Sequence, residues 1–382
     1  MRDVADRGGL TVVLLAPASS LHTRRWASAL TAAGHRIVVA SWQPGPSMHG
    51  AEVRIAPVPG TGPARRAPLA ALWLRGLIAD VRPDVVHVHS LGAHGMLSLA
   101  LPRGPARVVT PWGSELHAAR HSAARAAMVR LAVSQADLVL PTSAEVAGEL
   151  TRGYAVPLER MRVLSWGVAQ ELIAARPLIS AGPVRSALGV PADATVVLSV
   201  RSTAATYRIL EVVSAFARAA ADRPDLFLIV LGGHTPDRES ARRAKEGYLG
   251  QVRDTARAAQ GRLLIVEHTL SPEETFELMC ASDIAVSIPV NDQRSSSVLE
   301  AALAGCRLVL SDIAPYREMT GDGLAADLLP EPVTVSLAEY LRHVSADDAS
   351  GRSNQLFIVT QENGATKVGV LEGIYWQLAG RT

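Results

Sequence analysis

The sequence predicts an α/β protein built from two Rossmann-like halves. Its 382 residues exceed the usual size of a single domain. An apolar strand pattern, a polar loop, a helix pattern and a second strand pattern open the chain from Thr11–Ala16 onward. The same order restarts at Thr195–Val200, after a stretch rich in Pro, Ala and Gly that runs to Val190. We therefore expect a doubly wound sheet in each half.

Composition and charge narrow the class of protein. A hydrophobic content of 48% with 19% charged residues fits a globular chain. The formal charge of +2 is small for this length, so no general nucleic-acid surface is expected. The two cysteines, Cys280 and Cys306, lie in apolar contexts and indicate core residues in a reducing compartment. No apolar run reaches the length of a membrane span, and Asp3 and Asp6 argue against a signal peptide, so the expected location is the cytoplasm.

The first half has the opening of a nucleotide-binding fold without its phosphate fingerprint. The loop Pro17–His22 leads into a helix pattern from Thr23, but no G-x-G-x-x-G follows the first strand, which argues against a dinucleotide cofactor. In the later strand pattern Val85–Ser90, alternation sends His87 and His89 to the same face. No carboxylate or cysteine completes a metal site beside them. We expect a core histidine at 87, a cleft residue at 89 and no metal.

The stretch Ser287–Ser311 in the second half carries the clearest functional pattern. An apolar run leads into a polar loop with Asp292, a helix pattern opens at the serines, and Gly305 ends it. Strand, polar loop and helix N-terminus is a layout that α/β enzymes use to hold a phosphate. Glu300 then has two interpretations. It closes a capping box with Ser297 as the N-cap, or it binds the ribose of a nucleotide whose phosphates face the serine N–H groups.

The spacing within this stretch resembles a family motif. Seven residues separate Asp292 from Glu300, and Ala-Ala-Leu-Ala-Gly follows. This pattern resembles the Glu-x7-Glu motif of the retaining family-4 glycosyltransferases, which have the GT-B fold. The resemblance extends over nearly the whole chain, since 163–168 is similar to the family's hinge segment and 112–115 to a turn of its first domain.

The resemblance implies the domain organisation of the GT-B fold. Two Rossmann-like domains would face each other across a cleft, and a C-terminal helix would cross back to the first domain. We place the acceptor-binding domain at 1–172, the nucleotide-sugar-binding domain at 173–362 and the returning helix at 363–382.

The resemblance also implies cations that grip the diphosphate of a nucleotide-sugar donor. In the family, an arginine follows the first strand of the second domain, and a lysine lies about five residues later. Arg201 matches the arginine, whereas Thr206 and Tyr207 stand where the lysine is expected. Arg208 is the candidate second cation, because a guanidinium binds phosphate well; the alternative is a solvated charge at a helix start.

Carboxylates and loop groups complete the implied donor site. Glu300 would hold the ribose and Asp292 the hydroxyls of the donor sugar, so the candidate catalytic residues are Arg201, Asp292 and Glu300. Further donor-binding candidates lie at strand ends and in the motif loop: Gly232, Gly233, Glu267, His268, Gln293, Arg294, Ser295, Ser296, Ser297 and Val298.

The implied acceptor site lies in the first half. Trp112 stands where many relatives have a catalytically helpful histidine, so no side-chain base is assigned to that turn. The few aromatic residues and the lack of a basic amphipathic helix favour a small polar acceptor over a membrane lipid. Acceptor-binding candidates lie in or near the loops after the strands: Ser19, Ser20, His22, His89, His94, Trp112 and Glu115.

The predicted function is transfer of a sugar from a nucleotide-diphosphate sugar to a hydroxyl of a small polar acceptor such as a natural product. The preferred donor is a UDP-sugar. The resemblance implies retention at the anomeric carbon, with no metal and no cofactor beyond the donor. Two alternatives stay open: a catalytically impaired partner protein that binds nucleotide sugars, and a UDP-sugar 2-epimerase on the same fold. The chain is expected to act as a monomer or homodimer.

Overall fold

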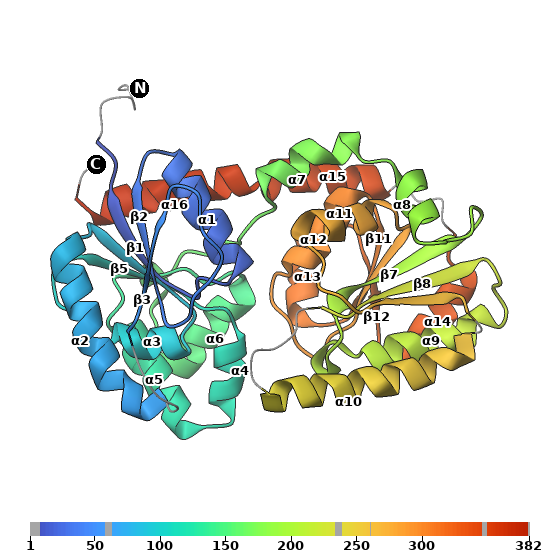
Figure 1. Cartoon of the computed structure of the whole chain (residues 1–382), viewed down its shortest axis with the longest axis horizontal. Coiled ribbons are helices and arrows are strands. Elements are labelled where there is room, and N and C mark those ends of the chain that lie inside the picture. The colour runs from blue at the N-terminus through green and yellow to red at the C-terminus, as the bar shows by residue number, and fades with distance from the viewer. Residues whose placement is uncertain (1–7, 58–62, 234–238, 260, 346–349, 381–382) are drawn as a thin grey trace. The chain divides into compact units, whose positions relative to one another are not determined.

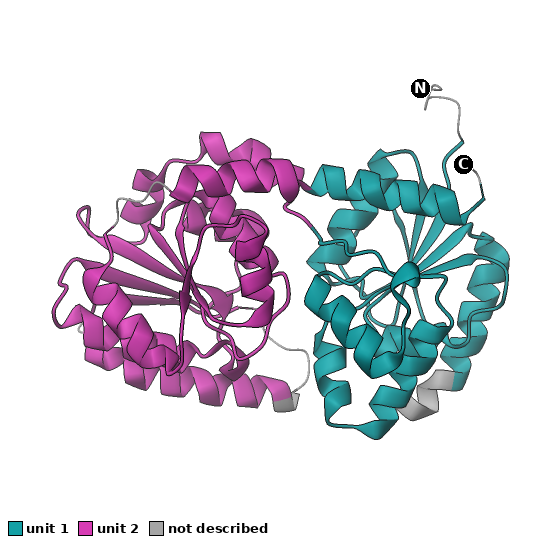
Figure 2. Cartoon of the chain, turned by 180° about the vertical axis from the view of Figure 1, so that it is seen from behind, with its two compact units in different colours: residues 1–166, 364–382 teal, residues 167–363 magenta. Residues whose placement is uncertain are grey.

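The computed structural model describes residues 8–57, 63–233, 239–259, 261–345 and 350–380. It divides into two compact units (Figure 2). Unit 1 comprises residues 1–166 and 364–382, and unit 2 comprises residues 167–363. The boundary expected at residue 172 therefore falls inside the first helix of unit 2, α7 (Gln170–Ala175).

Unit 1 contains a six-stranded parallel sheet in the order β3-β2-β1-β4-β5-β6. Apolar side chains on both faces of its central strands are buried, as a parallel sheet between helical layers requires. The strands are β1 (Thr11–Leu15), β2 (Arg36–Ser41), β3 (Glu52–Ile55), β4 (Val85–His89), β5 (Ala106–Thr110) and β6 (Leu138–Val139).

Helices cover both faces of this sheet (Figure 1). One layer packs α1 (Leu21–Ala32) and α16 (Gly364–Leu378) on the sheet, and the other packs the helices between them in sequence. That second group comprises α2 (Pro63–Val81), α3 (Ala93–Ser98), α4 (Ser114–Arg120), α5 (Ala123–Ser134) and α6 (Ala144–Tyr154), followed by the short helix η2 (Leu158–Arg160).

Helix α16 is part of the core of unit 1 although it comes from the end of the chain. Leu371, Ile374 and Tyr375 are at most 1% exposed. The Tyr375 hydroxyl also bonds Nδ1 of His87 at 2.6 Å. The expected return of the C-terminal helix to the first domain is thus confirmed.

Unit 2 contains a second six-stranded parallel sheet, in the order β12-β11-β10-β7-β8-β9. Numbered within each unit, both sheets have the strand order 3-2-1-4-5-6 of a Rossmann fold. The strands are β7 (Thr195–Ser202), β8 (Leu226–Leu231), β9 (Leu263–Val266), β10 (Ile284–Ser287), β11 (Arg307–Ser311) and β12 (Asp327–Leu329).

The helices of unit 2 also form two layers. One face is covered by α9 (Ile209–Ala220), α10 (Glu239–Ala256) and α14 (Val333–His343). The other is covered by α7, α8 (Ala181–Ala187), α11 (Pro272–Cys280), α12 (Ser296–Ala304), α13 (Ala314–Gly321) and α15 (Ser350–Gln361). Short helices of the described residues lie in the connections, namely η3 (Arg176–Leu178), η4 (Ala205–Tyr207) and η5 (Arg257–Ala259).

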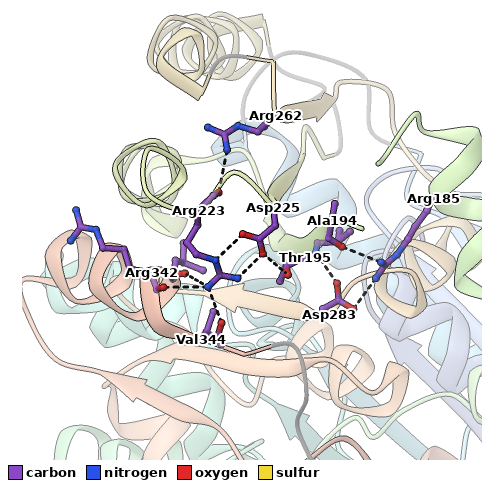
Figure 3. Close-up of polar contacts among 11 residues, drawn as sticks. Arg185, Ala194, Thr195, Arg223, Asp225, Arg262, Asp283, Arg342 and Val344 are labelled. Carbon is purple, nitrogen blue, oxygen red and sulfur yellow. Dashed lines mark hydrogen bonds and ion pairs between the residues drawn. The ribbon is translucent and has the colours of Figure 1, made fainter. Parts of the chain in front are cut away.

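Arginines cap the ends of several helices. The Arg223 guanidinium donates to Arg342 O and Val344 O at the end of α14 and forms an ion pair with Asp225, as Figure 3 shows. Arg262 donates to Arg223 O (Figure 3) and to Ala220 O, the last residue of α9. These bonds satisfy carbonyl groups that have no partner within their own helix and place a cation at its negative end.

Candidate functional site

The strand order fixes where a ligand site is expected in unit 2. In a doubly wound sheet, ligands bind outside the carboxyl ends of the strands where the strand order reverses. Here the reversal lies between β7 and β10. Arg201 lies near the end of β7, and the loop that carries Asp292 follows β10. Arg201 and the motif residue Asp292 therefore both lie at the topological switch point.

Arg201, Asp292 and Ser295 are in direct contact. Arg201 Nη1 lies 3.4 Å from Asp292 Oδ2 and donates to Ser295 Oγ at 2.6 Å. The Arg201 and Asp292 side chains are 14% and 12% exposed. The ring of Tyr207 lies against the guanidinium, with 4.1 Å between the ring centroid and Cζ. Burial works against the charge of Arg201, but Asp292 and the two tyrosines Tyr207 and Tyr316 outweigh it and raise the pKa of Arg201.

Asp292 is held in place from its other side. The hydroxyl of Tyr316 donates to Asp292 Oδ2 at 2.8 Å, and the backbone N–H of Gln293 donates to Oδ1 at 2.9 Å. Tyr316 is fully buried, and burial, followed by the charge of Asp292, raises its pKa well above its usual value. Because the single Tyr316 proton points to Asp292, Ser287 Oγ at 2.8 Å donates to the phenol oxygen. Asp292 thus has a fixed orientation before any ligand binds.

The helix that follows begins earlier than the sequence pattern suggested. Its N-cap is Ser295, not Ser297, and Glu300 lies five positions further on, too far to close a capping box. The capping interpretation of Glu300 is therefore wrong. The Ser295 side chain makes no capping bond and instead accepts from Arg201. Gly305 ends the helix with a φ of 98°, a left-handed conformation that favours glycine.

The two other arginines proposed for the donor are held by carboxylates of unit 2. Arg208 pairs with Glu331 at 2.6 Å and occupies the left-handed N-cap position of α9. Arg294 pairs with Glu362 at 2.8 Å and with Asp322 at 2.7 Å, and it is 9% exposed. Arg294 therefore anchors the loop through its side chain, and its assignment to the donor, like that of Arg208, stays a prediction.

Directly after β8, the backbone at Gly232 and Gly233 passes very close to the ends of the neighbouring strands β9 and β7. A Cβ on Gly232 would lie 2.7 Å from Val266 O, and a Cβ on Gly233 would lie 2.1 Å from the Cβ of Ser202. Gly233 also has a φ of 71°. No other residue fits either position without a shift of the backbone.

The side chains of the two donor candidates that follow β9 are exposed. Glu267 forms an ion pair with Arg253 at 2.7 Å, and His268 lies on the surface. The hydrogen bond from Arg253 lowers the pKa of Glu267.

The switch point of unit 1 lies between β1 and β4 and gathers aromatic rings. His22 lies in the first turn of α1, after β1, and stacks on Trp166 with 4.7 Å between ring centroids. His89 ends β4, and its ring centroid lies 5.4 Å from that of Trp166 and 5.7 Å from that of Trp26. Trp112, after β5, contacts the rings of His22, His89 and Trp166. Three acceptor candidates are therefore brought together with two tryptophans that the sequence reading did not assign.

The two histidines on β4 differ in their partners. His87 is fully satisfied, by Tyr375 and by Thr110 Oγ1 at 2.7 Å, as expected of a core histidine. His89 is equally buried, yet neither of its ring nitrogens has a hydrogen-bond partner among the residues that the structure describes. Within the same described residues, Nε2 of His94, which is 7% exposed, also has none.

All three of these rings are uncharged at neutral pH. Burial lowers the pKa of His87 to about 3 and that of His94 to about 4. Burial, followed by the charges of the neighbouring histidines, lowers the pKa of His89 well below its usual value.

Two of the remaining acceptor candidates, Ser20 and Glu115, have structural partners. Ser20 is the N-cap of α1 and accepts from the N–H of Thr23. Glu115 is 9% exposed and accepts from the backbone N–H groups of Leu91 and Trp112, so it ties two loops of the switch point together. Ser19, the third of these candidates, is exposed.

Comparison with known proteins identifies the architecture. Residues 19–172 match the model of Glycosyltransferase Family 4. The whole chain has the GT-B fold. The predicted fold class is thereby confirmed, and the predicted resemblance to family 4 is confirmed over residues 19–172. The search of curated proteins finds no match.

Solved structures similar to this GT-B chain cover nearly all of it. Sucrose-phosphate synthase from Thermosynechococcus elongatus is 16% identical with a TM-score of 0.79, over 98% of this chain and 100% of that chain. Anabaena HepE, solved with UDP and glucose, is 16% identical with a TM-score of 0.76, over 96% and 100%. A UDP-forming α,α-trehalose-phosphate synthase from Burkholderia xenovorans is 13% identical with a TM-score of 0.74, over 97% and 99%.

Two further features of the described residues concern metal binding and membrane insertion. Among the described residues, no group of three or more His, Cys, Asp or Glu side chains is placed to hold a metal ion. In the same part of the chain, no helix has the length and apolar character needed to cross a bilayer.

Proposed function

We propose that this protein transfers a glycosyl group from a nucleoside-diphosphate sugar to an acceptor hydroxyl, with retention at the anomeric carbon and without a metal. The observation that carries the proposal is the contact of Arg201 with Asp292 and Ser295 at the switch point of unit 2. The GT-B fold and the family-4 match of unit 1 support it. HepE, with a similar fold, was solved with UDP, which favours a UDP-sugar as donor.

In this proposal, unit 2 stabilises the leaving group. When the bond between the anomeric carbon and the phosphate oxygen breaks, negative charge grows on the diphosphate. Arg201 and the N–H groups of Ser296 and Ser297 in the first turn of α12 would face that charge, which is where electrostatic stabilisation contributes most. These N–H groups have no acceptor within their own helix. Asp292 would bind the donor sugar, and Glu300 the ribose.

Unit 1 would hold the acceptor in this scheme. His22, His89 and Trp112 meet at its switch point, and the buried histidines are uncharged. Neutral imidazoles donate and accept hydrogen bonds, which suits hydroxyl groups better than phosphates. A small polar acceptor, such as a natural product, fits these groups.

The test is a transfer assay with variants of the proposed catalytic residues. Arg201→Ala and Glu300→Ala should each lower turnover by about tenfold or more, on the order of 1.4 kcal/mol. Arg317→Ala, an exposed arginine on α13, serves as the control and should leave turnover unchanged. Wild-type turnover in Arg201→Ala would contradict the proposal.

The same assay separates the alternatives. A catalytically impaired partner protein would bind a nucleoside diphosphate, seen as a thermal shift, and turn over no donor. The substitution of Thr206 and Tyr207 for the expected lysine favours this as the second candidate. A 2-epimerase would consume the donor with no acceptor present.

A further inference from the structure

A cavity of about 410 Å³ lies at the carboxyl ends of β7 and β8 in unit 2. Ser202, which directly follows Arg201, lines it together with Thr203 and Ala204 of the same connection. Gly232 lines it from the end of β8, and Lys245 and Tyr248 line it from α10. The cavity therefore adjoins the strand end that carries the proposed diphosphate ligand.

Lys245 is unusual in this chain. The sequence has 38 lysines and arginines, of which Lys245 and Lys367 are the only lysines. A chain that uses arginine almost everywhere has nonetheless a lysine at this cavity. Lys245 is half-buried, and its Nζ donates to Gly233 O at 2.8 Å. An ammonium has three donors on a flexible stem, so it can bond this carbonyl and a phosphate oxygen at the same time.

The arginines near the switch point are already balanced by carboxylates. Arg201 faces Asp292, Arg208 faces Glu331, and Arg294 faces Glu362 and Asp322. A diphosphate carries more negative charge than Arg201 alone offsets, and that charge increases as the sugar leaves. The site therefore needs a further cation at the carboxyl end of this sheet.

We propose that Lys245 is that cation and contacts the diphosphate of the donor from the side of α10. The inference rests on the proposed function and deepens it, since it assigns to α10 the charge that the Thr206–Tyr207 segment does not supply. Burial lowers the pKa of Lys245, against the opposing charge of Glu246, and a bound diphosphate would reverse that shift.

The two lysines make a footprinting experiment direct. The wild-type protein is acetylated with a limiting amount of an N-hydroxysuccinimide ester, alone, with UDP and with uridine, and each lysine is quantified by mass spectrometry. At a UDP concentration about ten times Kd, modification of Lys245 should slow about tenfold, because only the unbound fraction reacts. Lys367, in unit 1, should react at the same rate throughout, and uridine, which lacks phosphate, should not protect Lys245.

A substitution makes the contact itself testable. Lys245→Met should weaken UDP binding about tenfold, or about 1.4 kcal/mol, and leave uridine binding unchanged. Lys367→Met is the matched control and should bind UDP like the wild type. Undisturbed unfolding transitions in both variants would show that they fold.

The possible outcomes distinguish a failure of this inference from a failure of the proposed function. If UDP stabilises the protein but Lys245 is acetylated equally fast with and without it, or Lys245→Met binds UDP normally, this inference is wrong and the proposed function stands. If neither UDP nor GDP, ADP or TDP stabilises the protein, the proposed function and this inference both fall.

Discussion

At the scale of single residues, the site depends on one buried hydrogen-bond chain. Ser287, Tyr316 and Asp292 form it, and it ends at the guanidinium of Arg201. Each member fixes the orientation of the next. The Asp292 side chain is therefore held in one rotamer before a ligand binds, so binding costs it little conformational entropy. Tyr316 comes from the start of α13, far from Asp292 in the chain, and only the fold brings them together.

Tyr316→Phe should lower the free energy of unfolding by about 1–3 kcal/mol, because it leaves two buried oxygens short of a partner. It should also weaken nucleoside-diphosphate-sugar binding, since Asp292 loses its fixed position. The control is Tyr340→Phe, which removes a comparable tyrosine–aspartate bond to Asp327 elsewhere in unit 2. Urea unfolding and calorimetric titration of both variants check this. Equal donor affinity in the two variants would contradict it.

Asp292 and the serine-led helix could be located from the sequence because a strand, a polar loop and a helix start are local patterns, whereas Arg201 is assigned through the family resemblance. The sequence pattern placed the N-cap two residues too late, since three consecutive serines are all suitable caps. It missed Tyr316, Trp26 and Trp166, whose roles depend on contacts between distant segments. A single aromatic residue in an apolar stretch does not indicate which distant segment its side chain contacts.

At the scale of elements, arginines stabilise helix ends throughout the protein. Arg223 donates to a carbonyl oxygen at the end of α14, and Arg262 donates to one at the end of α9. Arg176 donates to Ala304 O at the end of α12. In the same way, Arg185 donates to Ala281 O at the end of α11. A planar guanidinium carries several donors, so one arginine can bond a helix-end carbonyl and a second partner at the same time.

Arg223→Ala should lower the stability of unit 2 by about 2 kcal/mol, because it removes the bonds to the end of α14 and the ion pair with Asp225. The matched control is Arg257→Ala, whose side chain is 82% exposed and pairs only with Asp254 in the described contacts. The control should change stability by less than about 0.5 kcal/mol. Urea unfolding followed by circular dichroism compares them, and an equal loss in both variants would refute the capping role.

At the scale of the whole molecule, the two units can be observed separately. All six tryptophans, Trp26, Trp42, Trp73, Trp112, Trp166 and Trp376, belong to unit 1. Tryptophan fluorescence therefore reports on unit 1 alone, and circular dichroism reports on both units. The sequence predicted two Rossmann-like halves from the repeated strand–helix order. It did not predict the strand order, which results from long-range pairing.

Unit 1 should lose stability in mild acid. Its buried His87 and His94 have pKa values of about 3 and about 4, against 6.5 for an exposed histidine. Below pH 6.5, the unfolded state binds a proton on each ring that the folded state does not. Stability is therefore full above pH 6.5 and falls as the pH drops toward 4, at up to about 1.4 kcal/mol per pH unit for each histidine.

Urea unfolding at pH 7 and pH 5, followed by tryptophan fluorescence, measures this loss. The fluorescence midpoint should move to lower urea at pH 5. A midpoint that stays constant between these pH values would mean that the histidines are not buried as neutral rings.

Calorimetric titration of wild type and Arg201→Ala with UDP, GDP, ADP and TDP tests the central claim most directly, namely that a diphosphate binds between Arg201 and the start of α12. We predict that the wild type binds at least one of them. Arg201→Ala should bind it about tenfold more weakly or worse, while Arg317→Ala retains the wild-type Kd. A wild type that binds none of the four, or an Arg201→Ala variant with unchanged Kd, would contradict the claim.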